Sequence, residues 1–191
     1  MRVGLRFAVR GTWCFAAGGL LAGAGQWLAF AEGGSSAAAL PRAMPLLVGM
    51  AFLGGTIGSA LFGYRQCLSM HRLRPLAGFG AGFGLAALVV MATLSGVHGG
   101  GDGAYRHAAL GLGAGFGLAG GIGGVCLDPI YLLPGLLAFG VAGAIGGPLT
   151  LWLMMQAGGL GWGHHGLLAA QTLGVTLTYA MGGAGFGAFI R

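Results

Sequence analysis

Apolar residues form six long runs along the chain, and polar residues gather in the short stretches between them. The runs cover residues 12–31, 45–64, 75–97, 108–127, 130–154 and 166–190. About 20 apolar residues suffice to cross a hydrocarbon core about 30 Å thick. Backbone groups inside a bilayer must bond within their own segment, so such runs form helices. The pattern predicts an all-α, polytopic transmembrane bundle of about six spans.

The break between the fourth and fifth runs is the shortest. Only Asp128 and Pro129 separate them, and this residue pair favours a tight turn. The combined run far exceeds the thickness of a bilayer, so we expect two spans here. We expect the chain to divide at this turn, with a glycine-packed four-span unit over residues 1–128 and an added two-span hairpin over residues 129–191.

Glycine is unusually common inside these apolar runs. The 191 residues include 45 glycines, and 56% of the chain is hydrophobic while only 6% is charged. The block GAGFGLA at 80–86 recurs unchanged at 113–119, and its first five residues recur at 183–187. Glycines four residues apart share one helix face and let a partner backbone approach. The block therefore predicts close helix packing, with the third and fourth spans as its tight centre.

The glycines that we expect to make these contacts are Gly54, Gly58, Gly78, Gly82, Gly111, Gly113, Gly115, Gly117, Gly121, Gly183 and Gly187. The phenylalanines inside the repeated block, Phe83 and Phe116, should point away from the glycine face. There they would fill the next gap between helices or meet lipid.

The charges sort by membrane side. The net charge is +6, and all nine cationic residues are arginine. With six spans, one side carries Arg2, Arg6, Arg10, Arg65, Arg72, Arg74 and Arg191, and the other carries Arg42 and Arg106. In a bacterial or organelle-synthesised protein this asymmetry places both termini inside. No basic stripe lies on a soluble face, so we expect no nucleic-acid partner.

Three of these arginines lie close together between the second and third spans. Arg65, Arg72 and Arg74 have two readings, which stay open. They anchor the topology, or they contact an anionic phospholipid such as cardiolipin, since basic pockets between spans bind such head groups.

The spans offer little for chemistry. None has an acidic or basic residue in its middle, which argues against an ion-coupled transporter. The polar groups Gln26, Gln171, Thr172, Thr176 and Thr178 should bond across helices or to their own helix carbonyls.

Histidine and cysteine show no metal-binding pattern. His164 and His165 are adjacent, so a helix would point them about 100° apart, and we expect a solvated loop pair. The three cysteines, Cys14, Cys67 and Cys126, lack metal-site spacing and should be free thiols. We therefore expect no catalytic, metal-binding or cofactor-binding residue and no cofactor.

The end of the second span carries a resemblance. Residues 59–71, SALFGYRQCLSMH, are followed by arginines, Pro75 and a small-residue helix. This stretch resembles the mitochondrial inner-membrane translocase superfamily, and most closely its accessory subunit in the membrane arm of respiratory complex I. Phe62, Cys67, His71 and Arg74 are the matching positions, and the likeness covers residues 12–127. The chain departs from the family where Arg74-Pro75 replaces an acid-proline pair, and in its fifth and sixth spans.

The resemblance implies a non-catalytic accessory subunit of a large inner-membrane complex, and respiratory complex I is the complex that we expect. Other membrane subunits and phospholipid would then be its partners. The mitochondrial inner membrane is the expected location, and a bacterial inner membrane is the alternative. Two other functions stay open. One is a protein- or solute-translocating channel component. The other is a pigment- or quinone-associated subunit using His98, His107 or the His164-His165 pair.

Overall fold

The protein is an all-α helical bundle. The computed structural model describes residues 2–30, 40–63, 73–95 and 102–190, and this part contains six α-helices, one short 3₁₀ helix and no strand. The elements are α1 (Arg2–Phe30), α2 (Leu40–Gly63), α3 (Leu73–Ser95), α4 (Asp102–Leu127), η3 (Pro129–Tyr131), α5 (Leu132–Gly159) and α6 (Gly163–Phe189).

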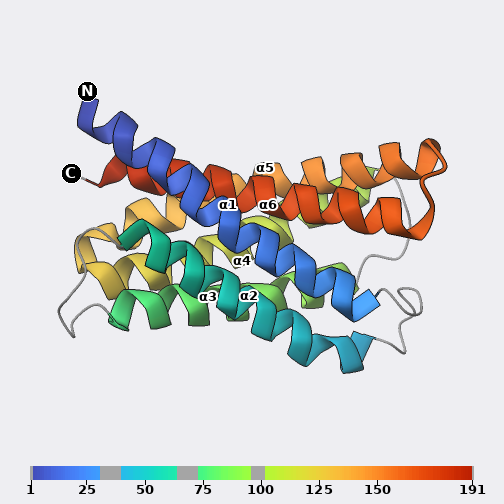
Figure 1. Ribbon diagram of the computed structural model, residues 1–191, viewed down its shortest axis with the longest axis horizontal. Coiled ribbons are helices and arrows are strands. Elements are labelled where there is room, and N and C mark those ends of the chain that lie inside the picture. The colour runs from blue at the N-terminus through green and yellow to red at the C-terminus, as the bar shows by residue number, and fades with distance from the viewer. Residues whose placement is uncertain (1, 31–39, 64–72, 96–101, 191) are drawn as a thin grey trace.

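The six helices form a closed ring. Each helix packs against its neighbours in the sequence, and α6 packs against α1 to complete the circle. The helices alternate in direction, so the N- and C-termini lie at the same end of the bundle (Figure 1). The expectation that α3 and α4 form the centre is wrong. They are two adjacent members of a ring, and side chains fill its middle.

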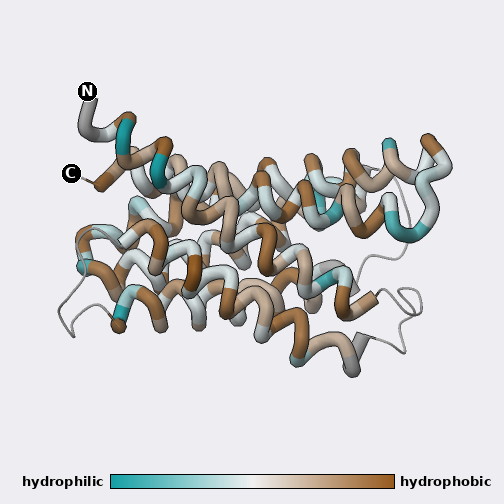
Figure 2. Tube along the Cα trace, viewed as in Figure 1, coloured by the Kyte–Doolittle hydropathy of each residue, from teal (hydrophilic) through white to brown (hydrophobic). Residues whose placement is uncertain are grey.

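The chain is an integral membrane protein. Five of the six long helices in the described part are long and apolar enough to cross a bilayer. The colours of Figure 2 show apolar residues along the helices and the strongly polar ones near the two ends of the bundle. The sixth helix, α6, has 27 residues and includes two histidines, a glutamine and three threonines. It lies alongside α5 and α1 (Figure 1), so we count it as a span by its position.

The turn between α4 and α5 forms where Asp128 and Pro129 predict it. The Asp128 carboxylate accepts a hydrogen bond of 3.0 Å from the Ile130 backbone N–H, and Pro129 begins η3. The two runs are therefore separate helices, as predicted. The proposed division of the chain at residue 128 stays a prediction. In the ring, α5 packs on α4 and α6 packs on α1, so the last two helices close the circle.

Glycine allows close backbone approach around the ring. A Cβ atom added to Gly54 on α2 would lie 2.5 Å from the carbonyl oxygen of Gly18 on α1. The same kind of mutual approach joins Gly120 of α4 to Gly135 of α5, and Gly11 of α1 to Gly183 of α6. The glycine faces thus meet one another within the chain, and the close contacts are not confined to α3 and α4.

The predicted packing glycines lie against several kinds of neighbour. Backbone atoms of another helix stand closest to Gly54, Gly82, Gly115, Gly117, Gly183 and Gly187. Side chains stand closest to the others, namely Gly58 (Phe15), Gly78 (Cys126), Gly111 (Thr93), Gly113 (Ala144) and Gly121 (Leu132).

The two copies of the seven-residue block pack against each other. Gly82, the third residue of the first copy, faces Ala119, the seventh residue of the second, and an added Cβ would lie 2.8 Å from the Ala119 Cα. Gly115, the third residue of the second copy, faces Ala86, the seventh of the first, at 3.0 Å from its carbonyl oxygen. The antiparallel pair α3–α4 therefore has a local two-fold relation that the repeat creates.

Aromatic rings fill the middle of the ring of helices. Every helix contributes at least one to this aromatic core, which consists of Phe15, Phe62, Phe79, Phe83, Phe116, Phe139, Tyr179 and Phe186. The phenylalanine of each glycine block, Phe83, Phe116 and Phe186, is buried in this core. We expected Phe83 and Phe116 either to fill a gap between helices or to meet lipid, and the structure shows the first of these.

Candidate functional site

A partly open cavity of about 100 Å³ lies among the helices of the ring. Five of the six helices line it, and α5 is the exception. On α1 the lining residues Ala22 and Gln26 follow the core residue Phe15, and on α6 Val175 precedes Phe186. The cavity therefore occupies the half of the ring away from the chain termini, and the aromatic core closes it on the side of the termini.

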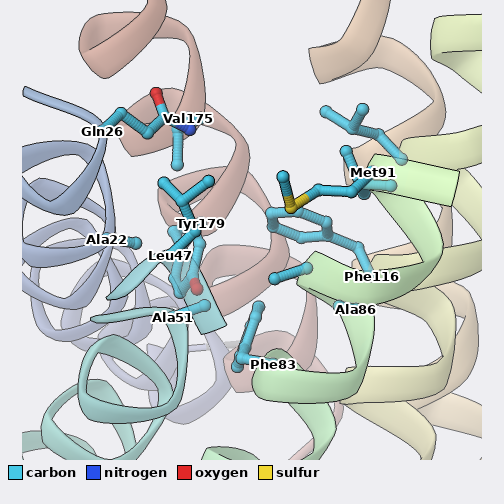
Figure 3. A pocket seen from close by; sticks show the side chains of 13 residues that line it. Ala22, Gln26, Leu47, Ala51, Phe83, Ala86, Met91, Phe116, Val175 and Tyr179 are labelled. Carbon is cyan, nitrogen blue, oxygen red and sulfur yellow. The ribbon is translucent and has the colours of Figure 1, made fainter. Parts of the chain in front are cut away.

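Three aromatic rings form one wall of the cavity. Phe83 stacks on Tyr179 with ring centroids 4.2 Å apart, and Phe116 meets Phe83 edge-on at 5.4 Å. Met91 lies beside Phe116, and Gln26 and Phe83 stand at opposite ends of the lining in the view of Figure 3. Most of the remaining lining is aliphatic, so the cavity offers dispersion contact and almost no polar partners.

Gln26 is the exception. Its Oε1 atom is buried and has no hydrogen-bond partner within the described part of the protein. Such buried acceptors are uncommon in folded proteins, and each calls for an explanation. We expected Gln26 to bond across helices or to the carbonyls of its own helix, and its carbonyl oxygen has no partner within the described part of the protein.

The three threonines of α6 behave as expected, whereas the expectation for Gln171 stays a prediction. Thr176 and Thr178 donate to the carbonyl oxygens of Thr172 and Gly174 in their own helix, at 2.8 Å each. Thr172 donates across to the Gly23 carbonyl on α1 at 3.3 Å. These hydroxyls are therefore already bonded to backbone, and the Gln26 oxygen is the buried acceptor without a partner in the described part of the protein.

The histidine pair lies on α6, so the expected loop placement is wrong. His164 donates from Nε2 to the Phe30 carbonyl at the end of α1, at 2.8 Å. His165 stacks on Trp27, with centroids 5.5 Å apart and planes 12° apart. The pair therefore packs the start of α6 against the end of α1. His107 contacts its own helix through the Gly103 carbonyl at 2.8 Å, and His98 lies outside the described residues.

The predicted lipid-contact arginines are described only in part. Arg74 is exposed in the first turn of α3, while Arg65 and Arg72 lie outside the described residues. At the same end of the bundle, Arg10 donates to the Leu61 carbonyl near the end of α2, at 3.4 Å. That contact places the positive charge of Arg10 at the C-terminal end of α2, where the helix dipole stabilises a cation. The anionic-lipid contact stays a prediction.

The cysteines that the structure describes, Cys14 and Cys126, are free thiols, and Cys67 lies outside the described residues. Among the described residues no three His, Cys, Asp or Glu side chains come together as a metal site.

A second, shallower hollow lies on the outside, between α5 and α6. Its volume is about 310 Å³, and it is lined only by apolar residues, namely Leu137, Ala138, Val141, Ala142, Ile145, Met181, Gly185 and Phe189. Ala138, Ala142 and Gly185 are its small residues, and the exposed Leu137, Val141, Ile145 and Phe189 are its large ones. We call this hollow the outer groove.

Comparison with known proteins found no related protein. No family model, no curated protein and no solved structure matches this chain. The resemblance of residues 12–127 to the translocase superfamily therefore stays a prediction from the residues that carry it.

Proposed function

We propose that this chain is a non-catalytic structural subunit of a larger inner-membrane assembly. The outer groove carries the proposal. In a bilayer, helices associate through close van der Waals packing, and small residues at the interface permit it. The outer groove combines small residues with exposed apolar side chains, which is a surface suited to a transmembrane helix of another subunit.

The glycine faces do not require partners from other chains, because they contact one another and other helices within this chain. The proposal of a partner subunit is supported by the outer groove, which no side chain of the described part of the ring fills. The choice of respiratory complex I as the first assembly to test rests on the resemblance of residues 12–127 alone.

The channel alternative has less support. A path for polar solutes needs unsatisfied polar groups along several helices, whereas the α6 threonines bond to backbone carbonyls and aromatic rings occupy the core. An aromatic core of this kind favours a closed, non-conducting ring.

Native gel electrophoresis of membranes solubilised in mild detergent, with mass spectrometry of the band that contains the chain, tests the proposal. We expect a large band with co-purifying membrane subunits. A lone monomer would contradict a subunit role, and a small homo-oligomer would favour the channel alternative.

A pair of variants tests the outer groove as the contact. Val141 lines it and is exposed, so Val141→Trp should block a partner helix and release the chain from the large band. Leu53 is also exposed but belongs to α2, which stands opposite α5 in the ring. Leu53→Trp should leave the band intact. Equal bands for both variants would mean that the partner binds elsewhere or that lipid fills the outer groove.

A further inference from the structure

We propose that the outer side of α1 binds the head group of an anionic phospholipid, with Arg6 and Arg10 on its phosphate and Trp13 beneath them. This surface lies on the first turns of α1. It is therefore separate from the outer groove and from the predicted contact of the arginines around the start of α3. Its ligand is a lipid and not a protein, so the inference does not rest on the proposed subunit role.

The position of these residues along α1 places them at the surface of the bilayer. The first apolar run begins at residue 12 and is long enough to cross the hydrocarbon core, whereas α1 already begins at Arg2. Trp13 is 74% exposed, and exposed tryptophans collect at the boundary between hydrocarbon and head groups. Arg10 and Arg6 lie about one and two helical turns beyond it, at the level of the lipid phosphates.

The two arginines can reach one phosphate together. Arg6 and Arg10 are four residues apart, so they are neighbours on one face of the helix. Arg6 is exposed, and Arg10 is half-buried beside α2, where it donates to the Leu61 carbonyl at 3.4 Å. A guanidinium group has five N–H donors. The contact with α2 therefore leaves Arg10 with further donors for a phosphate.

The positive charge of this surface has no acidic neighbour among the side chains that the structure describes. Of the three acidic residues in the chain, the structure describes the side chain of Asp128 alone. Its carboxylate accepts from the Ile130 N–H in the turn between α4 and α5, and α4 stands opposite α1 in the ring. The head groups of anionic lipids carry the negative charge at this depth of a membrane, and they attract basic segments next to a span.

The chemistry of the head group decides which lipid this surface prefers. Phosphatidylglycerol and phosphatidylcholine both have a phosphate, but the choline group would bring a second cation beside the two arginines. The glycerol group adds only hydroxyls. Each arginine near an anionic membrane surface strengthens binding by roughly fivefold. We therefore expect a preference for phosphatidylglycerol that depends on Arg6 and Arg10.

Quenching of Trp13 fluorescence by brominated lipids tests this at the site itself. The full chain, with Trp27, Trp152 and Trp162 replaced by phenylalanine, is reconstituted in phosphatidylcholine vesicles. These contain an equal small fraction of either brominated phosphatidylglycerol or brominated phosphatidylcholine. We expect a relative affinity of roughly fivefold or more for phosphatidylglycerol. A control protein that keeps only Trp152, which is half-exposed on α5, should show a much smaller preference.

Arginine variants in the same background separate this pair from the general charge of the protein. Arg6→Gln with Arg10→Gln should bring the relative affinity near Trp13 close to one, and Arg6→Gln alone should lower it if the double variant does not fold. Arg106→Gln removes an exposed arginine of α4 and should leave the preference unchanged. Equal quenching by both lipids before any arginine is replaced would overturn the proposal, leaving the arginines as topological anchors only. A preference that persists in the double variant would also overturn it, because other charges would then attract the lipid.

Discussion

Glycine residues differ in what surrounds their missing side chain. At the contacts between helices, an added Cβ would meet the backbone of the next helix, as at Gly120 against the Gly135 carbonyl oxygen. Elsewhere the space is open, as at Gly49 in α2, where nothing lies within 4 Å. The sequence alone does not distinguish the two kinds, because both lie in apolar helical runs rich in small residues.

Replacing these two glycines by alanine should have opposite effects. Gly120→Ala should lower the free energy of unfolding by about 1–3 kcal/mol, because the helices must move apart to admit the methyl group. Gly49→Ala should raise it slightly, by up to about 1 kcal/mol, since alanine is the better helix former and meets no neighbour. Unfolding in mixed detergent with increasing SDS measures both, and equal effects would contradict the close approach of α4 and α5.

Phenylalanine shows a similar contrast between the core and the lipid-facing surface. Phe139 is fully buried, and its ring contacts those of Phe15, Phe79, Phe83 and Phe186. Phe139→Ala should therefore leave a void and cost about 3 kcal/mol or more. The matched control is Phe189→Ala, since Phe189 is 53% exposed on the outside. The same SDS titration should show a shift for the first variant and almost none for the second.

The helices themselves could be predicted from the sequence because the length of an apolar run decides whether it spans a bilayer. All six predicted spans correspond to helices, and Asp128 and Pro129 mark the break between α4 and α5. The start of α6 was harder to place, because His164 and His165 read as solvated residues. They contact the end of α1, a partner that lies more than a hundred positions away in the sequence.

The turn between α4 and α5 should depend on the hydrogen-bond acceptor of Asp128, not on its charge. The carboxylate accepts from the Ile130 N–H at 3.0 Å. Asp128→Ala should cost about 1 kcal/mol, as loss of a helix cap does, whereas Asp128→Asn keeps an acceptor and should cost much less. Thermal unfolding in detergent compares them, and an equal loss in both would show that the charge matters instead.

The closed ring and its cavity could not be predicted from the sequence, and the reason is physical. Pairing of membrane helices depends on which small residues face each other, and here small residues lie on several faces of most helices. Gln26 was recognised as a polar group inside a span. The cavity beside it depends on five helices at once, and the small lining residues Ala22, Ala51 and Ala86 come from three of them.

Closure of the ring between the first and last helices is the feature that most needs a direct test. A Cβ atom added to Gly23 on α1 would lie 3.1 Å from the Thr172 Cβ on α6. Disulfides join Cβ atoms about 3.8 Å apart, so cysteines at 23 and 172 should be close enough to link after a small adjustment. The native Cys14, Cys67 and Cys126 would be replaced by serine to leave one reactive pair.

In this background Gly23→Cys with Thr172→Cys should form a disulfide under mild oxidation, which mass spectrometry of the joined peptides would detect. The control pairs Gly23→Cys with Gly103→Cys. Gly103 lies in the first turn of α4, which stands opposite α1 in the ring, and has nothing within 4 Å of an added Cβ, so no link should form. If the first pair stays reduced, or if both pairs link equally, α1 and α6 do not close the ring. The interior cavity would then lose one of its walls, because residues of both helices line it.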